Sequence, residues 1–401
     1  MLQTYRAAFS APGAALFSAT GALARLPLSM TGLGIVLVVA LRTDSYGRAG
    51  TVAAVYVLVA SISGPLQGRI ADRAGQAPVL WVAGALHATG IVLTLLYVDS
   101  AVPLPHLAVA VAGLGAPQAG NMVRARWAHV LEDREQVSTA FAIEAVLDEA
   151  VFVVGPVLVT FLTLQVAESS GLLAAGIVST LASWALALQR GSEPPIPERT
   201  GQAAAPINLA LLWPLTVVSV GLGVLFGSTE VVVVAFTDEA GRDNLAGVIL
   251  AVWALGSLIS GLIVGALPSR EPLRRMRWAL FGLTVLFVPL SLIDGIPLLA
   301  IGMLGAGLMI SPTVIAMTRL VETGVPARRF TEALGWITTG LAGGVALGAA
   351  VVGRVIDAQG ASAGFLVPLG SVAVATLLAW TRVPSARAAA PMTDYGGSQD
   401  D

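Results

Sequence analysis

The chain has 401 residues, of which 56% are hydrophobic and 11% charged, and its formal net charge is −2. Soluble domains carry about 25% charged residues, so this composition excludes a protein whose whole surface faces water. The absence of cysteine excludes disulfides and cysteine-bound metals. All 22 basic residues are arginine, so the lysine of a GxxxxGK[ST] phosphate-binding loop is missing. ATP-driven transport by this chain alone is therefore excluded.

Twelve apolar segments follow one another along the chain, and a membrane-spanning helix needs about 20 such residues. The ninth segment is the weakest, because it is short and contains Pro289. The pattern predicts an all-α integral membrane protein with twelve transmembrane helices, at residues 14–41, 49–71, 78–98, 104–123, 139–164, 171–189, 209–236, 245–267, 278–293, 296–318, 332–353 and 363–381.

The arginines in the loops predict the orientation. With the N-terminus in the cytoplasm, seventeen arginines lie on the cytoplasmic side, Arg25 lies within the first segment, and four lie on the outer side: Arg42, Arg48, Arg242 and Arg354. Such an excess of cytoplasmic positive charge is typical of multi-pass membrane proteins. Residues 1–12 do not resemble a cleaved signal peptide. We therefore expect a multi-pass protein of the cell inner (cytoplasmic) membrane with both termini in the cytoplasm.

One long polar stretch interrupts the apolar segments. Residues 190–207 contain four prolines and charges of both signs, which is typical of a linker. This stretch predicts an N-terminal six-helix bundle at 1–190, a cytoplasmic linker at 191–206 and a C-terminal six-helix bundle at 207–384. We expect residues 385–401 to form a disordered cytoplasmic tail.

The two halves of the sequence resemble each other. A shift of 197 residues places Ala49-Gly50 on Ala246-Gly247 and brings further residues of the second segment onto the eighth. A parallel six-plus-six repeat is a transporter architecture, with substrate bound near the bilayer midplane between the halves. The other matched pairs are Ser63-Gly64 with Ser260-Gly261, Gly68 with Gly265, Arg73 with Arg270, Tyr56 with Trp253, Pro117 and Arg124 with Pro312 and Arg319, and Ala140 and Gly155 with Ala333 and Gly348.

The loop between the second and third segments, GRIADRAGQA at 68–77, carries a motif. It resembles the signature loop of the major facilitator superfamily, which has Gly, three residues, Asp, Arg, one residue, Gly and two basic residues. Gln76 and Ala77 depart from the two basic positions. The four matching residues, which we assign to a gating loop, are Gly68, Asp72, Arg73 and Gly75.

The resemblance implies a fold and a mechanism. It implies two pseudo-symmetric six-helix bundles that rock about a central site, with the first, fourth, seventh and tenth helices lining the cavity. It also implies that the signature loop packs against the eleventh helix, which would bring Asp72 near Thr331 and Glu332. In the second half Ser269 and Arg270 align with the motif's Asp-Arg pair, so the acid is missing and we expect the gate to be asymmetric.

Several ionisable residues lie within the apolar segments, where each charge costs about 2.5–3.5 kcal/mol to insert. Glu144 and Asp148 are four residues apart and share a helix face, with Glu149 about 100° around the helix. Because neighbouring carboxylates repel each other, we expect at least one of Asp148, Glu149 and Glu144 to exchange a proton with solvent. Arg25 in the first segment is a candidate partner for one of these acids.

The same charges also have structural interpretations. Glu144 is near enough to the start of its helix to reach cytoplasmic water or to pair with Arg124 or Arg126. Arg25 lies in the cytoplasmic third of a long helix and can extend to the interface. Glu230, in the seventh segment, lies near the outer water on this interpretation. As candidate cavity or substrate residues we take Arg25, Gln118, Asn121 and Glu230; for Gln118 and Asn121 the alternative is a helix-to-helix contact.

Two further patterns bear on direction and coupling. Gly155-Pro156 resembles part of the antiporter motif of drug-efflux members of the superfamily, although Val151 and the pair Val159-Thr160 stand where that motif has glycines. This favours export. Gly115 occupies the position before Gln118 at which many proton-coupled relatives carry a buried arginine, which argues against proton coupling.

These features together predict a secondary transporter that exports a small organic molecule in exchange for protons by alternating access. A facilitator or importer of a small metabolite is the alternative, and a membrane-embedded enzyme or a transport-dead sensor is a remote one. We expect no enzymatic activity, no cofactor, no nucleic-acid partner and a monomeric protein. We also expect no metal site, because the three histidines (His87, His106 and His129) are far apart in the sequence.

Overall fold

The computed structural model describes residues 9, 11–131, 133–196, 209–265, 271–293, 295–325 and 330–384. All regular elements in these ranges are helical. The N-terminal half, residues 11–196, contains α2 (Ala14–Thr43), α3 (Tyr46–Ala74), α4 (Gln76–Tyr97), α5 (Leu104–Leu114), α6 (Ala119–Val130), α7 (Arg134–Phe161), η1 (Leu162–Val166), α8 (Ser170–Leu188) and η2 (Arg190–Ser192).

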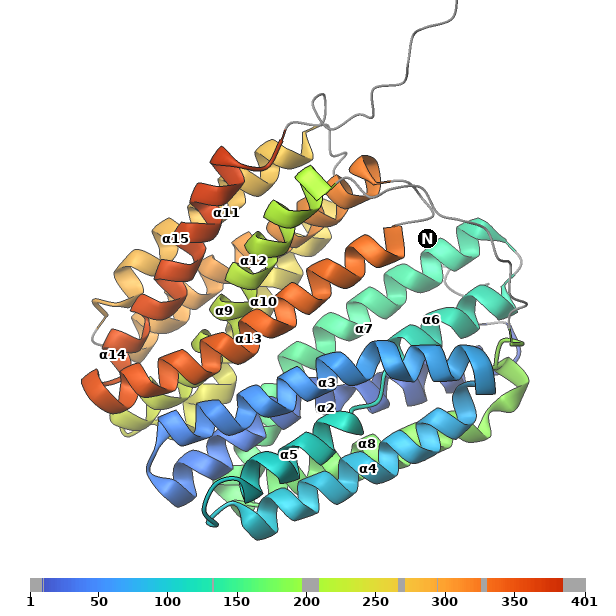
Figure 1. Cartoon of the computed structure of the whole chain (residues 1–401), viewed down its shortest axis with the longest axis horizontal. Helices are drawn as coiled ribbons and strands as arrows, with labels where there is room; N and C mark the ends of the chain where they lie inside the picture. The colour runs from blue at the N-terminus through green and yellow to red at the C-terminus, as the bar shows by residue number, and fades with distance from the viewer. Residues whose placement is uncertain are drawn as a thin grey trace, which may run out of the picture.

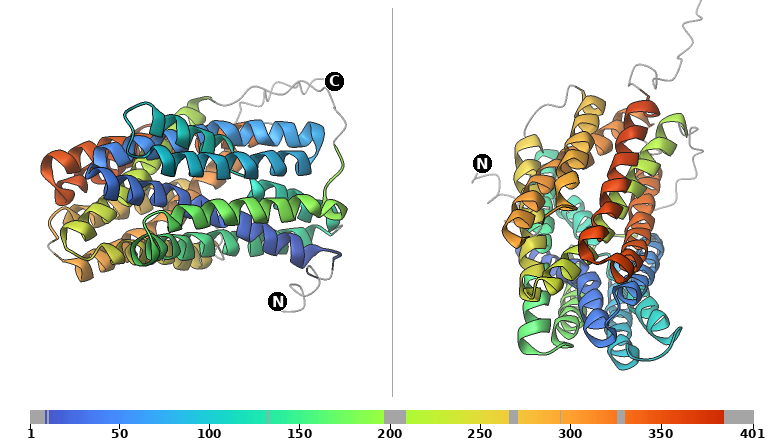
Figure 2. Two further views of the ribbon diagram at one scale, coloured as in Figure 1. Left: turned by 90° about the horizontal axis from the view of Figure 1, so that it is seen from below. Right: turned by 90° about the vertical axis from the view of Figure 1, so that its left-hand side faces the viewer.

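The C-terminal half, residues 209–384, repeats this order. It contains α9 (Leu209–Glu239), η3 (Asp243–Leu245), α10 (Ala246–Gly265), α11 (Pro272–Leu290), α12 (Ile296–Gly324), α13 (Phe330–Gln359), α14 (Ala361–Gly364) and α15 (Leu366–Thr381). Figures 1 and 2 show the helices of each half gathered on its own side of the molecule, with all long axes running in roughly one direction. The tail at 385–401 and most of the linker lie outside the described residues.

Ten of the described helices are long and apolar enough to cross a membrane. The two remaining predicted spans have identifiable reasons for falling short. The fourth is divided between α5 and α6, and the ninth, α11, begins with Arg274, Arg275 and Arg277. Counting these two, the described chain contains the twelve predicted transmembrane segments, and the all-α fold with two six-helix groups is confirmed.

The division of the fourth segment corrects the prediction of one continuous helix at 104–123. Residues 115–118 leave the helical path, and Pro117 has no backbone N–H with which to continue the hydrogen-bond ladder. Such a break leaves carbonyl groups without partners in a region without water. The side chain of Gln67, on α3, donates to the carbonyls of Leu114 (3.2 Å) and Ala116 (2.9 Å). Ser63 donates to Leu114 as well (2.6 Å).

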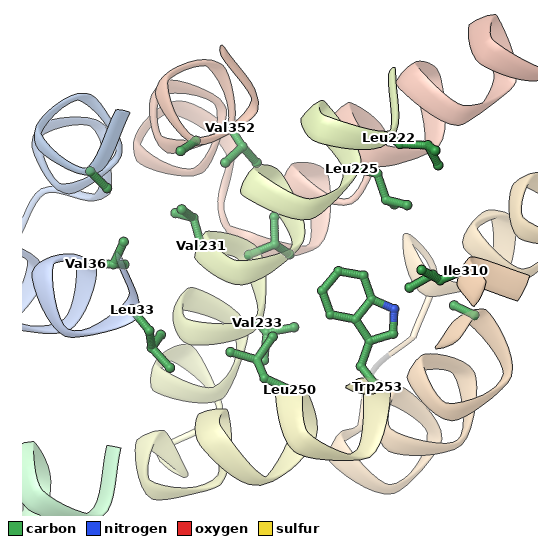
Figure 3. Packing of buried hydrophobic residues seen from close by; sticks show 14 of the residues in the cluster. Leu33, Val36, Leu222, Leu225, Val231, Val233, Leu250, Trp253, Ile310 and Val352 are labelled. Atoms are coloured by element: carbon green, nitrogen blue, oxygen red, sulfur yellow. The ribbon is translucent and has the colours of Figure 1, made fainter. Parts of the chain in front are cut away.

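The two halves share one apolar core. A cluster of buried side chains extends from α2 through α9 and α10 to α12 and α13. Figure 3 shows Leu33 and Val36 of α2 on the side facing Val231 of α9, with Leu250 and Trp253 of α10 beyond. Large apolar side chains also lie on the outside of the bundle, for example Ile62 at 72% exposure and Leu96 at 68%. Such a surface is stable in lipid, where no water has to be excluded from it.

The side-chain repair of the α5–α6 break yields a test. We expect Gln67→Leu to lower the free energy of unfolding by about 1–3 kcal/mol, because the carbonyl of Ala116 loses its side-chain donor and that of Leu114 keeps only Ser63. Unfolding in mixed micelles with increasing dodecyl sulfate would measure the change. The matched control is Leu66→Ala on the exposed face of the same helix. A Gln67→Leu variant as stable as wild type would show that the carbonyls find other donors.

Candidate functional site

The acids of the fifth membrane segment meet arginines from two other helices at the inner end of the N-terminal half. We call Arg25, Arg124, Glu144 and Asp148 the inner ion cluster. Arg25 of α2 pairs with both Glu144 and Asp148 of α7, and its bond to Asp148 is 2.7 Å long. Arg124 of α6 pairs with the other oxygen of Asp148. Three helices are thus tied together by two positive and two negative charges.

Glu144 is the buried member of this cluster, with no exposed surface. One carboxylate oxygen accepts hydrogen bonds from Ser18 Oγ (2.7 Å) and Trp127 Nε1 (2.8 Å), and the other pairs with Arg25. The interpretation that Arg25 neutralises an acid is realised, and the pairing of Glu144 with Arg124 or Arg126 is not. A carboxylate with three donors is satisfied as an anion, which makes Glu144 a fixed charge of the fold.

Asp148 and Glu149 differ from Glu144 in their surroundings. Asp148 keeps 31% exposure while bound to two arginines. Glu149 is partly buried, and among the described residues no side chain donates to it or pairs with it. The repulsion between Glu144 and Asp148, on which the sequence argument rested, is offset by Arg25 between them. Glu149 is the acid of this helix whose charge remains without a partner among the residues described.

The remaining cavity candidates are dispersed. Gln118 lies at the α5–α6 break, where its side chain packs against Gly64 of α3, in keeping with a helix-to-helix contact. Asn121, three residues further along α6, is exposed. Glu230 lies in the other half on α9, partly buried, with its carboxylate towards Gly32 of α2.

The signature loop turns the chain between α3 and α4 at Gly75. This residue has φ +86, a conformation that favours glycine. Asp72 and Arg73 are exposed, and neither forms an ion pair with a described residue. Gly68 has open space where a side chain would be. The expected approach of Asp72 to Thr331 and Glu332 lies outside the described side chains, as does the match of Arg73 with Arg270.

The two positions that depart from the motif have their own partners. The carboxylate of Glu193, from the start of the linker, accepts hydrogen bonds from the backbone N–H groups of Gln76 and Ala77 and so caps α4. An acid at a helix N-terminus is favoured by the helix dipole. Buried Arg126 donates to Gln76 Oε1 (2.8 Å), and it also binds Gln189 O and Ser192 Oγ. A basic residue at position 76 would therefore face Arg126.

The two halves are joined at the opposite end, which the predicted orientation places outside the cell, and we call this junction the outer seal. Asp357, on the last turns of α13, accepts hydrogen bonds from Ser45 Oγ and from the N–H groups of Tyr46 and Gly47, each 2.9 Å long. Tyr46 Oη donates to Asp238 of α9 (2.9 Å). Between described residues, the hydrogen bonds that connect the halves all belong to this seal.

Glycines bring the backbones together at the same end. A Cβ atom at Gly50 of α3 would overlap the carbonyl oxygen of Ala349 of α13, and one at Gly247 of α10 would overlap that of Pro156 of α7. Gly50 and Gly247 are equivalent in the sequence repeat, and so are Ala349 and Pro156, as neighbours of Gly348 and Gly155. With the predicted orientation, the outer side is closed, and the described residues of the two halves share no hydrogen bond towards the cytoplasm.

Comparison with protein families agrees with this geometry. The model of the Major Facilitator Superfamily matches residues 17–324. The chain belongs to the major facilitator superfamily. Solved transporters share the fold of this superfamily member at low sequence identity. No curated protein has a significantly similar sequence.

Three solved structures illustrate the likeness. A mutant of the nucleoside transporter NupG has a TM-score of 0.72 at 16% identity, covering 92% of this chain and 100% of that one. The peptide transporter POT in complex with sulfate gives 0.73 at 14% identity, with 92% and 94% covered. A bacterial homologue of the iron transporter ferroportin in the inward-facing state gives 0.68 at 15%, with 92% and 98% covered. Identities this low establish the fold alone.

The outer seal predicts how the protein responds to loss of Asp357. We expect Asp357→Ala to shift the balance towards outward-open molecules by about 5–30-fold, since losing several exposed hydrogen bonds to a carboxylate costs about 1–2 kcal/mol. The chain has no cysteine, so Gly32→Cys, beneath the seal, can report outside access to a membrane-impermeant maleimide.

The matched control for this experiment is Asp99→Ala. Asp99 is another exposed outer acid, but its partner is Arg42 within the same half. Labelling of the reporter should rise in the Asp357 variant and stay at the wild-type rate in the Asp99 variant. Equal labelling in all three proteins would show that the carboxylate does not hold the halves together.

Proposed function

We propose that this protein is a secondary transporter that exports a small organic molecule in exchange for protons by alternating access. The observation that carries the proposal is the pair of acids without partners among the described residues, Glu149 in one half and Glu230 in the other, in a two-half fold closed at one end. Acids inside a membrane protein are costly and mark ion or substrate pathways. The cell inner membrane, cytoplasmic termini and a monomeric state belong to the same proposal.

The partial antiporter motif supports export through its packing. A Cβ atom at Gly155 would overlap Ser29 Oγ of α2, and Ser29 donates to Val151 O of α7 (2.8 Å). One residue further on, Pro156 forms part of the outer seal. The motif thus lies where α7 touches both α2 and the opposite half, and a movement of α7 would change both contacts.

We assign the coupling proton to Glu149. The sequence leaves Asp148, Glu149 and Glu144 as candidates, but Asp148 is held by Arg25 and Arg124, and its protonation would weaken both ion pairs. Glu149 can bind or release a proton without breaking an ion pair. Its charge lies beside Asp148, so proton uptake by Glu149 would relieve repulsion and strengthen the hold of the inner ion cluster on α7.

The transport proposal predicts proton movement that depends on a compound. In inverted vesicles with an acid interior, reported by a pH-sensitive dye, a substrate added outside should collapse part of the gradient. Vesicles without the protein should not respond. A broad panel of cations, sugars, nucleosides and amphipaths that produces no response, together with counterflow of one of them, would instead favour a facilitator or an importer.

The assignment of the proton to Glu149 has its own test. We expect Glu149→Gln to abolish exchange driven by a pH gradient while counterflow of the same substrate continues, because the alternating movement needs no proton once the site is neutral. Glu144→Gln is the matched variant on the same helix. It should lower stability by about 3–5 kcal/mol, since Arg25 loses a buried partner. Gradient-driven exchange by Glu149→Gln at the wild-type rate would contradict the assignment.

A further inference from the structure

Glu230 is an acid without a counter-charge among the described residues, at the boundary between the halves. It lies on α9 nine residues before the helix ends at Glu239, which is about 14 Å from that end. Its two carboxylate oxygens would lie 3.6 and 3.9 Å from a Cβ atom on Gly32 of α2. Within the described part of the chain, no residue donates a hydrogen bond to this carboxylate and none forms an ion pair with it.

The other intramembrane charges do not compensate Glu230. Arg25 is committed to Glu144 and Asp148, and Arg124 to Asp148. The inner ion cluster is therefore neutral as a unit and has no positive charge to offer α9. Its members also belong to the inner end of the other half. The contact region between α2 and α9 thus holds an acid with no basic partner among the described residues, and an incoming positive charge would favour its ionised form.

The neighbours of Glu230 along α9 are buried: Ser228 and Thr229 precede it, and Val231, Val232 and Val233 follow it. Phe226 lies one turn towards the cytoplasm on the same face of α9, and its ring packs on Trp253 of α10 with 5.3 Å between centroids. A ligand moving from the cytoplasmic side would therefore meet an aromatic ring before the carboxylate. Rings and carboxylates both attract cations.

Because Gly32 has no side chain, the backbone of α2 comes close to the carboxylate, and even a Cβ atom there would be in ordinary van der Waals contact with it. The missing side chain is on the other half of the protein, so a ligand here would touch both halves at once. Contact with both halves is what allows a ligand to favour one facing of the transporter over the other.

From this placement we propose that Glu230 binds the positive charge of an organic cation whose aromatic or apolar body lies against Phe226 and the facing surface at Gly32. The proposal rests on the transport function proposed above and names its substrate class. A metal cation fits the site less well, because hard cations take several oxygen ligands. Among the described residues no group of three His, Cys, Asp or Glu side chains is placed to hold one.

A binding measurement on the purified full-length protein tests the proposal without transport. The probe is radiolabelled tetraphenylphosphonium in a scintillation proximity assay, with triphenylphosphine oxide as a neutral competitor of similar shape. We expect wild type to bind the cation and Glu230→Gln to bind it at least about tenfold more weakly, whereas the neutral compound should compete poorly with both. Glu322→Gln, which removes an exposed acid of the same half that pairs with Arg319, should bind the cation as wild type does.

The contact at Gly32 supplies a second pair of variants that keep the charge. In Gly32→Ala the new Cβ would be in ordinary contact with the carboxylate, 3.6 Å away, and binding should be nearly unchanged. Gly32→Leu should displace the carboxylate from this contact and weaken binding about as much as Glu230→Gln. Thermal unfolding of each variant in detergent identifies a protein that has lost its fold. If the variant of one position is unfolded, the comparison at the other position, Glu230 or Gly32, tests the proposal.

The outcomes separate this proposal from the transport function. Cation binding that is equal in wild type and Glu230→Gln overturns the proposal. So does a wild-type protein that ignores tetraphenylphosphonium while neutral or anionic compounds release protons from vesicles; the transport function then stands. Absence of both binding and proton release contradicts both. Loss of cation binding confined to Glu230→Gln and Gly32→Leu supports the site.

Discussion

The arrangement of this protein depends on two places where the backbones of its halves touch directly. Gly50 against Ala349 and Gly247 against Pro156 bring α3 to α13 and α10 to α7 without intervening side chains. Close approach of this kind is how helices associate in lipid, where apolar side chains gain little by meeting each other. Any larger residue at either glycine would force the outer ends apart. In the predicted orientation these contacts close the outer end of the protein.

The intramembrane charges have two different roles: some hold helices together, and others face the proposed transport pathway. Arg25 has the first role, since it pairs with Glu144 and with one oxygen of Asp148 and so binds α2 to α7. The donors Ser18 and Trp127 complete the shell of Glu144. With these charges neutralised locally, Glu149 and Glu230 remain as the intramembrane acids that no described residue surrounds in this way. A transporter needs a few unsatisfied groups, because a fully satisfied group gains nothing from a ligand.

Sequence reasoning was sufficient for the twelve segments, because a bilayer requires long apolar runs. The two related halves and the superfamily were predicted from matched residues and from the motif at 68–77. Sequence reasoning also named Arg25 of the first segment as a candidate partner for the acids of the fifth, and the two are paired in the structure. It missed partners that depend on three-dimensional packing, such as Trp127 for Glu144, and it treated the fourth segment as continuous. A signal for that break was present in Pro117 beside Gly115. The hydrogen bonds from Gln67 to the carbonyls at this break come from another helix, so the local sequence pattern does not predict them.

The outer seal also shows where the two halves stop being equivalent. The contacts of Gly50 and Gly247 obey the repeat, but the close approach of Gly353 to Tyr46 and the polar contacts do not. By the shifts that align the halves, Asp357 corresponds to Leu164, and Tyr46 and Gly47 correspond to Asp243 and Asn244. The α3–α13 junction is therefore held by a carboxylate on a helix N-terminus, where water and salt can reach it, and the described α7–α10 junction by packing alone. Separation at α3–α13 replaces the lost hydrogen bonds with bonds to water, whereas separation at α7–α10 loses the packing of Gly247 against Pro156, for which water is no substitute. The outer end should accordingly part at α3–α13 and pivot on α7, the helix that also carries Glu149 and the inner ion cluster.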